Sequence, residues 1–106
     1  MAKQKPNIAI LGATGVVGRE ITKILDELKV EFNTIKFLSS AKSAGTKIEF
    51  QGKEYIVEEA KPESFDNINI VLASAGGSTS QKFAPEIVKR GGVLIDNSSA
   101  FRMDSE

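Results

Sequence analysis

The sequence contains neither cysteine nor histidine among its 106 residues. Without cysteine there is no disulfide framework, no thiolate metal site and no thiol nucleophile. Without histidine the chain lacks the commonest general base and the commonest metal ligand. The side chains that usually carry covalent or histidine-based catalysis are therefore missing. We expect a chain that binds a ligand but carries no catalytic residue and no metal site.

The sequence also lacks a net charge and a long apolar run. Its 14 basic and 14 acidic residues cancel, which leaves no sign of the concentrated basic surface that binds nucleic acid. No apolar stretch approaches the length of a membrane span, and residues 1–6 lead directly into a strand rather than a signal-peptide apolar region. We expect a cytoplasmic protein with neither nucleic acid nor a membrane as partner.

What remains is the composition of one globular domain, with 41% hydrophobic and 26% charged residues. A chain of 106 residues can bury a single core, but it is short for a complete two-substrate enzyme. We therefore expect one domain over residues 1–106.

The most informative stretch is a turn with glycines at every third position, Gly12-Ala13-Thr14-Gly15-Val16-Val17-Gly18. The apolar run of residues 7–11 before it predicts a buried strand. Apolar residues at helical spacing after it predict an amphipathic helix that starts near Thr14 or Gly15, with the Thr14 hydroxyl as its cap, and ends around Lys29.

A strand, a glycine turn and a helix in this order are typical of a phosphate-binding site. The N–H groups of the turn and the helix dipole favour an anion, and glycine allows a pyrophosphate to approach the backbone closely. The spacing differs from the commoner G-x-G-x-x-G fingerprint, so a tight turn without a ligand is the alternative. The flanking strand and helix favour nucleotide binding.

A second strand is predicted over residues 34–40, parallel to the first, which makes residues 7–40 a βαβ unit. It runs into the loop of residues 39–45, which contains hydroxyls and Lys42 but no carboxylate. In a doubly wound domain this position meets the adenosine ribose, where an acidic side chain suits a 2′-hydroxyl and a basic one a 2′-phosphate. Taken alone the loop is an ordinary polar loop; with a nucleotide site beside it, Lys42 favours NADP over NAD.

The rest of the chain continues the alternation of strands and helices. The pattern predicts an inserted hairpin, one helical turn with a proline near its start, a buried strand and a last buried strand, at residues 47–50 with 54–58, 61–65, 68–74 and 93–96. Between the last two strands we expect a glycine and hydroxyl loop at residues 75–80, followed by a helix. Pro85 should lie in its early turns or bend it, and Gly91 or Gly92 should end it.

The predicted fold class is α/β, with a Rossmann-like doubly wound, mostly parallel sheet and an inserted β-hairpin. Two glycine loops then follow the carboxyl ends of two parallel strands, the edge at which open α/β sheets bind ligands. Arg102 follows the last strand, where a guanidinium could hold a carboxylate or phosphate, although a loop arginine is usually solvated.

Four motifs in this order closely resemble the amino-terminal part of bacterial-type aspartate-β-semialdehyde dehydrogenase, at residues 12–18, 39–45, 74–80 and 96–102. The resemblance covers essentially the whole chain. It implies NADP-dependent reduction of L-aspartyl-4-phosphate to L-aspartate 4-semialdehyde and phosphate, in lysine, threonine and methionine biosynthesis. It also implies a parent enzyme that forms a homodimer or homotetramer.

The resemblance also implies roles for individual residues. The pyrophosphate of NADP would be held by Gly12, Thr14, Gly15, Val16 and Val17. The 2′-phosphate would be held by Ser39, Lys42 and Ser43, with lysine at a position where many members of the family carry arginine. The loop beside the nicotinamide would contribute Ser74, Ala75, Gly76 and Thr79. The phosphate of the acyl phosphate, or the incoming phosphate ion, would meet Arg102, with Asn97 in the same loop.

The chain departs from the family in lacking the cysteine nucleophile and the histidine acid–base of its chemistry, which in the family lie further along the sequence. We therefore expect residues 1–106 to be the NADP-binding domain without the catalytic and dimerisation domain, and inactive by itself. The alternatives are an N-acetyl-glutamyl-phosphate reductase-like domain and a non-catalytic nucleotide-binding module.

Overall fold

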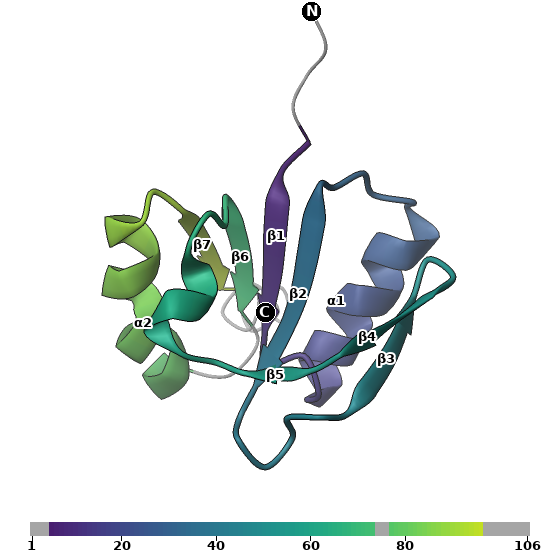
Figure 1. Ribbon diagram of the computed structural model, residues 1–106, viewed down its shortest axis with the longest axis horizontal. Helices are drawn as coiled ribbons and strands as arrows, with labels where there is room; N and C mark the ends of the chain where they lie inside the picture. The colour runs from purple at the N-terminus through teal and green to yellow at the C-terminus, as the bar shows by residue number, and fades with distance from the viewer. Residues whose placement is uncertain (1–4, 74–76, 97–106) are drawn as a thin grey trace, which may run out of the picture.

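The computed structural model of the protein describes residues 5–73 and 77–96 (Figure 1). Five strands form one parallel sheet in the order β5-β2-β1-β6-β7. Their bounds are β1 Asn7–Leu11, β2 Thr34–Ser39, β5 Glu58–Glu59, β6 Ile70–Ala73 and β7 Val93–Asp96. A separate antiparallel hairpin is formed by β3 Lys47–Phe50 and β4 Lys53–Ile56. The predicted Rossmann-like architecture with an inserted hairpin is confirmed.

Strand β1 is the centre of the sheet, and its side chains alternate between two cores. Ile8 and Ile10 join the core under helix α1 (Val16–Glu27), whereas Ala9 and Leu11 join the core under helix α2 (Gly77–Lys89). The strand is apolar from Ile8 to Leu11, because a parallel sheet with helices on both faces buries both sides of its central strands. Figure 1 shows the two helices on opposite sides of the sheet.

The chain winds outward from β1 in both directions. It passes through α1 to β2 on one side, and it later returns through β6 and α2 to β7 on the other. Right-handed crossovers that run in opposite directions place their helices on opposite faces, as the two cores require. All the carboxyl ends of the sheet strands therefore meet at one edge, which is where β1 enters the glycine turn.

Helix α1 begins at Val16 with Gly15 as its N-cap, and Gly15 has extended backbone angles, φ −76° and ψ 172°. No side chain caps the helix, so the predicted capping by Thr14 is wrong. The Thr14 hydroxyl instead lies 2.9 Å from the hydroxyl of Ser39, with which it forms a hydrogen bond. A tertiary partner has replaced the local one.

Two further boundaries differ from the sequence prediction. The strand expected over residues 54–58 is divided at the buried Val57, after which β5 pairs with β2 instead of continuing the hairpin. Helix α2 starts at Gly77, so Thr79 lies in its first turn and not in a loop. Pro85 lies in the second half of α2 rather than in its early turns, where its missing N–H removes one hydrogen bond from the helix.

The last strand, β7, was predicted to be buried, but Val93 is 57% and Ile95 43% exposed, because β7 is an edge strand of the sheet. Two further local predictions are confirmed. Residues Pro62–Phe65 form a single 3₁₀ turn with proline at its start. Helix α2 ends at Lys89, and Gly91, which has φ 86°, lies just beyond its end. The N–H groups of Gly91 and Gly92 donate to the carbonyls of Val88 and Ile87, both at 2.9 Å, in the arrangement by which glycine commonly ends a helix.

Aromatic rings attach the hairpin to the sheet. Phe50 of β3 and Tyr55 of β4 pack on Phe37 of β2, with ring centroids 5.8 and 5.3 Å from the Phe37 centroid. Phe37 and Phe50 are almost completely buried. The hairpin is therefore held beside α1 as part of the core and is not a free appendage.

Gly18 sets the distance between α1 and the glycine turn. A Cβ atom at this position would overlap the carbonyl oxygen of Gly12 and lie 2.9 Å from the Cα atom of Ala13. Both neighbours are backbone atoms, so a side chain cannot be accommodated by a rotamer change. Gly15 is different, because a Cβ there would meet only the Gly12 carbonyl oxygen, at an ordinary 3.5 Å.

We predict that Gly18→Ala lowers the free energy of unfolding by about 2–3 kcal/mol, because the helix must move away from the turn. Gly15→Ala, the matched control, should change the free energy of unfolding by less than about 1 kcal/mol, because alanine adopts the extended angles of Gly15 and is only a poorer N-cap residue. Urea denaturation followed by circular dichroism measures both. Equal losses for the two variants would contradict the role given to Gly18.

Candidate functional site

A pocket of about 600 Å³ lies at the carboxyl edge of the sheet. Four segments line it: the glycine turn, the loop after β2, the end of β5 and helix α2. Its lining residues are Leu11, Gly12, Thr14, Gly15, Ser39, Ser40, Ala41, Ser43, Glu59, Ala60, Lys82 and Phe83. We refer to it as the sheet-edge pocket.

The Leu38 carbonyl of β2 accepts two hydrogen bonds from the glycine turn. The donors are the N–H groups of Gly12, at 2.8 Å, and Ala13, at 3.0 Å. Gly12 adopts φ 83°, a conformation that favours glycine. These bonds bring the turn beside the loop that follows β2, so that two segments far apart in the sequence line one pocket.

Helix α1 presents its first N–H groups near this turn. Its first hydrogen bond runs from the Arg19 N–H to the Gly15 carbonyl, at 3.0 Å. The N–H groups of Val16, Val17 and Gly18 precede that bond and have no partner within the helix. Such groups, together with the helix dipole, form an anion-binding end.

The loop after β2 is folded on itself before any ligand binds. The N–H groups of Ser43 and Ala44 donate to the Ser40 carbonyl at 3.0 and 3.1 Å, and the Thr46 hydroxyl donates to the Ser43 carbonyl at 2.7 Å. Lys42 is exposed at the tip of this loop. The Lys42 ammonium is thus carried by a short, closed loop next to the pocket.

The pocket brings together five of the residues predicted from the sequence, namely Gly12, Thr14, Gly15, Ser39 and Ser43. Val16, Val17 and Lys42 lie in the adjoining segments but not in the lining. Thr79 belongs to the first turn of α2. The other predicted positions lie outside the described residues: Ser74, Ala75, Gly76, Asn97 and Arg102.

Seven lining residues were not predicted as site residues: Leu11, Ser40, Ala41, Glu59, Ala60, Lys82 and Phe83. Leu11, Ser40 and Ala41 adjoin predicted residues, whereas the other four come from segments to which no cofactor-binding role was given. Phe83 is buried, and the Lys82 ammonium lies 5.4 Å from the centre of its ring. Glu59 and Ala60 reach the pocket only because β5 pairs with β2. The one signal available was the position of Lys82 and Phe83 shortly after the second glycine loop.

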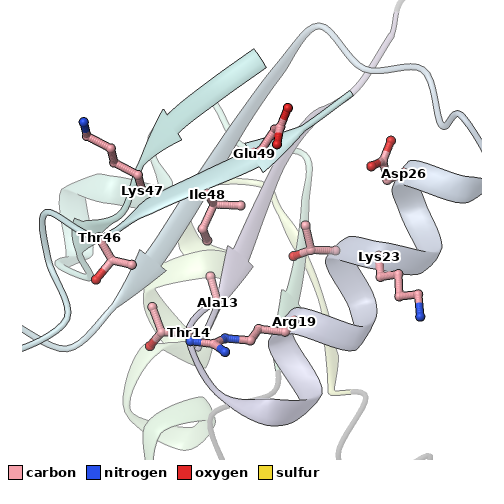
Figure 2. A pocket seen from close by; sticks show the side chains of 10 residues that line it. Ala13, Thr14, Arg19, Lys23, Asp26, Thr46, Lys47, Ile48 and Glu49 are labelled. Atoms are coloured by element: carbon pink, nitrogen blue, oxygen red, sulfur yellow. The ribbon is translucent and has the colours of Figure 1, made fainter. Parts of the chain in front are cut away.

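A second hollow, of about 380 Å³, lies between α1 and the start of β3 (Figure 2). Thr14 lines both hollows. Figure 2 shows Arg19 extending towards Thr14 at the end near the glycine turn, while Asp26 and Glu49 lie at the other end. Three cations, Arg19, Lys23 and Lys47, and two carboxylates, Asp26 and Glu49, line this hollow, so charges of both signs are mixed along it.

At the opposite edge of the sheet, polar side chains form hydrogen bonds within the protein. The Asn7 side chain donates to the Asn67 carbonyl at 2.7 Å and accepts from the Asn33 side chain at 2.8 Å, and the Asn7 N–H donates to the Asn69 side chain. Arg90 nearby pairs with Asp66 and Glu86, which raise its pKa. These groups stabilise the fold, and the carboxyl edge remains the better ligand site.

In residues 5–73 and 77–96 no helix is long and apolar enough to cross a membrane. Across the same residues, no group of three or more acidic side chains is gathered as a metal site would require.

A parallel doubly wound sheet, a glycine turn leading into a helix and a pocket at the carboxyl edge together define a dinucleotide-binding domain of the Rossmann-like class. The family model described as "Semialdehyde dehydrogenase, NAD binding domain" matches residues 7–106. The chain belongs to this family of NAD-binding domains.

Two proteins similar to the chain are both named aspartate-semialdehyde dehydrogenase. Aspartate-semialdehyde dehydrogenase of Bacillus subtilis (strain 168) is 56% identical over 98 residues, which cover 92% of this chain and 28% of that protein. The enzyme of Synechocystis sp. (strain ATCC 27184 / PCC 6803 / Kazusa) is 48% identical over 99 residues, which cover 93% of this chain and 29% of that protein.

A solved structure agrees with these relatives. The crystal structure of aspartate semialdehyde dehydrogenase II from Vibrio cholerae, complexed with ASA, superposes with a TM-score of 0.83 at 36% identity. The match covers 88% of this chain and 30% of that one. The resemblance recognised from the four motifs is confirmed, and the chain spans less than a third of the length of these relatives.

We predict that the hydrogen bond between Thr14 and Ser39 couples the turn to the loop. Thr14→Val and Ser39→Ala should each cost about 1 kcal/mol in the free energy of unfolding, and the double variant should cost clearly less than the sum. Urea denaturation of the three variants measures the coupling. Thr46→Val combined with Ser39→Ala is the control and should be additive; an equally additive Thr14 pair would contradict the coupling.

Proposed function

We propose that residues 1–106 are the NADP(H)-binding domain of an aspartate-semialdehyde dehydrogenase. The observation that carries this proposal is the Leu38 carbonyl, which holds the glycine turn beside the hydroxyl loop and so joins an anion-binding helix end to an adenosine-sized pocket. The similarity to proteins named aspartate-semialdehyde dehydrogenase supports the same assignment. As in those proteins, the chain would act as part of a longer polypeptide.

In this proposal each part of the site takes one part of the cofactor. The helix end and the turn hold the pyrophosphate through Gly12, Thr14, Gly15, Val16 and Val17. The loop after β2 holds the 2′-phosphate through Ser39, Lys42 and Ser43. The bound nicotinamide supplies the hydride for reduction of an acyl phosphate. Its surroundings would include Ser74, Ala75, Gly76 and Thr79, and the substrate phosphate would meet Arg102 and Asn97.

The preference for NADP over NAD rests on charge. The loop of residues 39–45 contains one lysine, three serines and no carboxylate, and a 2′-phosphate dianion needs cationic and hydroxyl partners. A lysine ammonium attracts the phosphate as a point charge without the two-point geometry of arginine. The expected preference is therefore electrostatic and falls as the salt concentration rises.

The wider setting belongs to the same proposal. The parent enzyme would reduce L-aspartyl-4-phosphate to L-aspartate 4-semialdehyde in the cytoplasm, on the way to lysine, threonine and methionine. It would do so as a homodimer or homotetramer, with its cysteine nucleophile and its histidine on segments that the 106 residues do not include.

We predict that Lys42→Glu lowers the affinity for NADPH at least about tenfold, because a carboxylate replaces the cation beside the 2′-phosphate. The affinity for NADH, which has no such phosphate, should change little. Titration of the intrinsic fluorescence of the two reduced nucleotides measures both constants. Lys53→Glu, an equal charge change at an exposed residue of the hairpin, is the control. Unchanged NADPH binding by Lys42→Glu would reject the 2′-phosphate assignment.

We also predict that the 106-residue chain alone does not turn over substrate. Incubated with aspartate 4-semialdehyde, phosphate and NADP⁺, it should produce no NADPH, because no thiol is present to form the thioacyl intermediate. The absorbance of NADPH measures the reaction, and nucleotide binding by the same sample shows that the chain is folded. Turnover that scales with the concentration of pure chain would contradict this proposal.

A further inference from the structure

Glu59 lines the sheet-edge pocket but belongs to none of the four sequence motifs. Strand β5 consists of only Glu58 and Glu59, and it pairs in parallel with the end of β2, Glu58 opposite Leu38 and Glu59 opposite Ser39. The Ala60 N–H donates to the Ser39 carbonyl at 2.9 Å and fixes this register. Successive residues of a strand point to opposite faces. Glu59 lines the pocket, and Glu58 does not.

The sheet order sets the distance between Glu59 and the phosphate-binding turn. The order β5-β2-β1 places Glu59 two strands away from the end of β1, which corresponds to about 10 Å at the usual spacing of strands. An adenosine group has a comparable length. With a pyrophosphate at the turn and a ribose at the end of β2, the purine would lie at β5.

The surroundings of Glu59 suit a purine base. Ala60 and the buried Phe83 belong to the same apolar cluster and both line the pocket. Lys82, which lies over the Phe83 ring, brings a cation to this wall. This part of the pocket thus offers apolar surface together with charged groups, whereas the part near β1 adjoins the start of α1.

The chemistry of a carboxylate selects the group that it contacts. An ionised carboxylate only accepts hydrogen bonds, and adenine carries one strong donor, its exocyclic amino group. A carboxylate against a 2′-phosphate would instead repel it. We propose, on the basis of the proposed cofactor site, that Glu59 accepts a hydrogen bond from the amino group of adenine and makes the site selective for that base.

The test compares NADPH with its hypoxanthine analogue, in which a carbonyl oxygen replaces the amino group. The wild-type chain should bind NADPH about tenfold more tightly, because the analogue places an acceptor against the carboxylate. Glu59→Gln should bring this ratio close to one, since its amide can also donate. Glu58→Gln, the same change on the other face of the strand, should keep the wild-type ratio. Fluorescence titration measures all six constants.

The outcomes separate this inference from the function on which it rests. If the wild-type chain binds neither nucleotide, the proposed function fails, and the inference fails with it. If it binds both equally, or if Glu59→Gln keeps the preference for adenine, only the role of Glu59 is overturned. NADH is titrated against the same three chains as a further control. If Glu59→Gln changes the ratio of NADPH to NADH affinity without changing the base preference, Glu59 lies at the ribose, and this also overturns the inference.

Discussion

The backbone contact between the start of α1 and the glycine turn is the constraint on which the rest of the structure depends. Gly18 allows the helix to lie directly on the Gly12 carbonyl, and the Leu38 carbonyl then holds the turn against β2. Neither interaction involves a side chain. Together they place a helix end, a turn and a loop around one pocket, with backbone atoms that mutation outside the glycines cannot remove. The position of the candidate site is thus set by backbone contacts of the fold.

Much of the fold follows from sequence periodicity. The apolar runs at β1 and β2, with the helical pattern between them, predicted a βαβ unit, and Gly91 predicted the end of α2. The failures share a physical cause. A strand of two residues such as β5 has no period to detect, and its pairing with β2 depends on the backbone of Ser39. Thr14 has the chemistry of a helix cap, but the hydroxyl of Ser39, 25 positions later, provides its partner. Tertiary contacts decided these points.

The candidate site was likewise predicted only in part from the sequence. The rule that ligands bind at the carboxyl edge of a parallel sheet predicted that Gly12, Thr14 and Ser39 would meet, and they share one pocket. The walls formed by Glu59 and by Phe83 could not be predicted, because neither residue follows a glycine loop directly or belongs to a recognisable motif. The segments proposed to bind phosphate can therefore be predicted from the sequence, whereas the surface opposite them is defined only by the three-dimensional fold.

The hairpin between β2 and β5 has a consequence for how the pocket can vary. The segment leaves the pocket at Ser43 and returns to it at Glu59, so both ends of the insertion form part of the pocket wall. Its base is fixed by the packing of Phe50 and Tyr55 on Phe37, whereas its tip, Gln51 and Gly52, is exposed. The tip can change in length or composition without moving the walls. We expect substitutions at Phe37, Phe50 or Tyr55 to alter the width of the pocket, although none of these residues lines it.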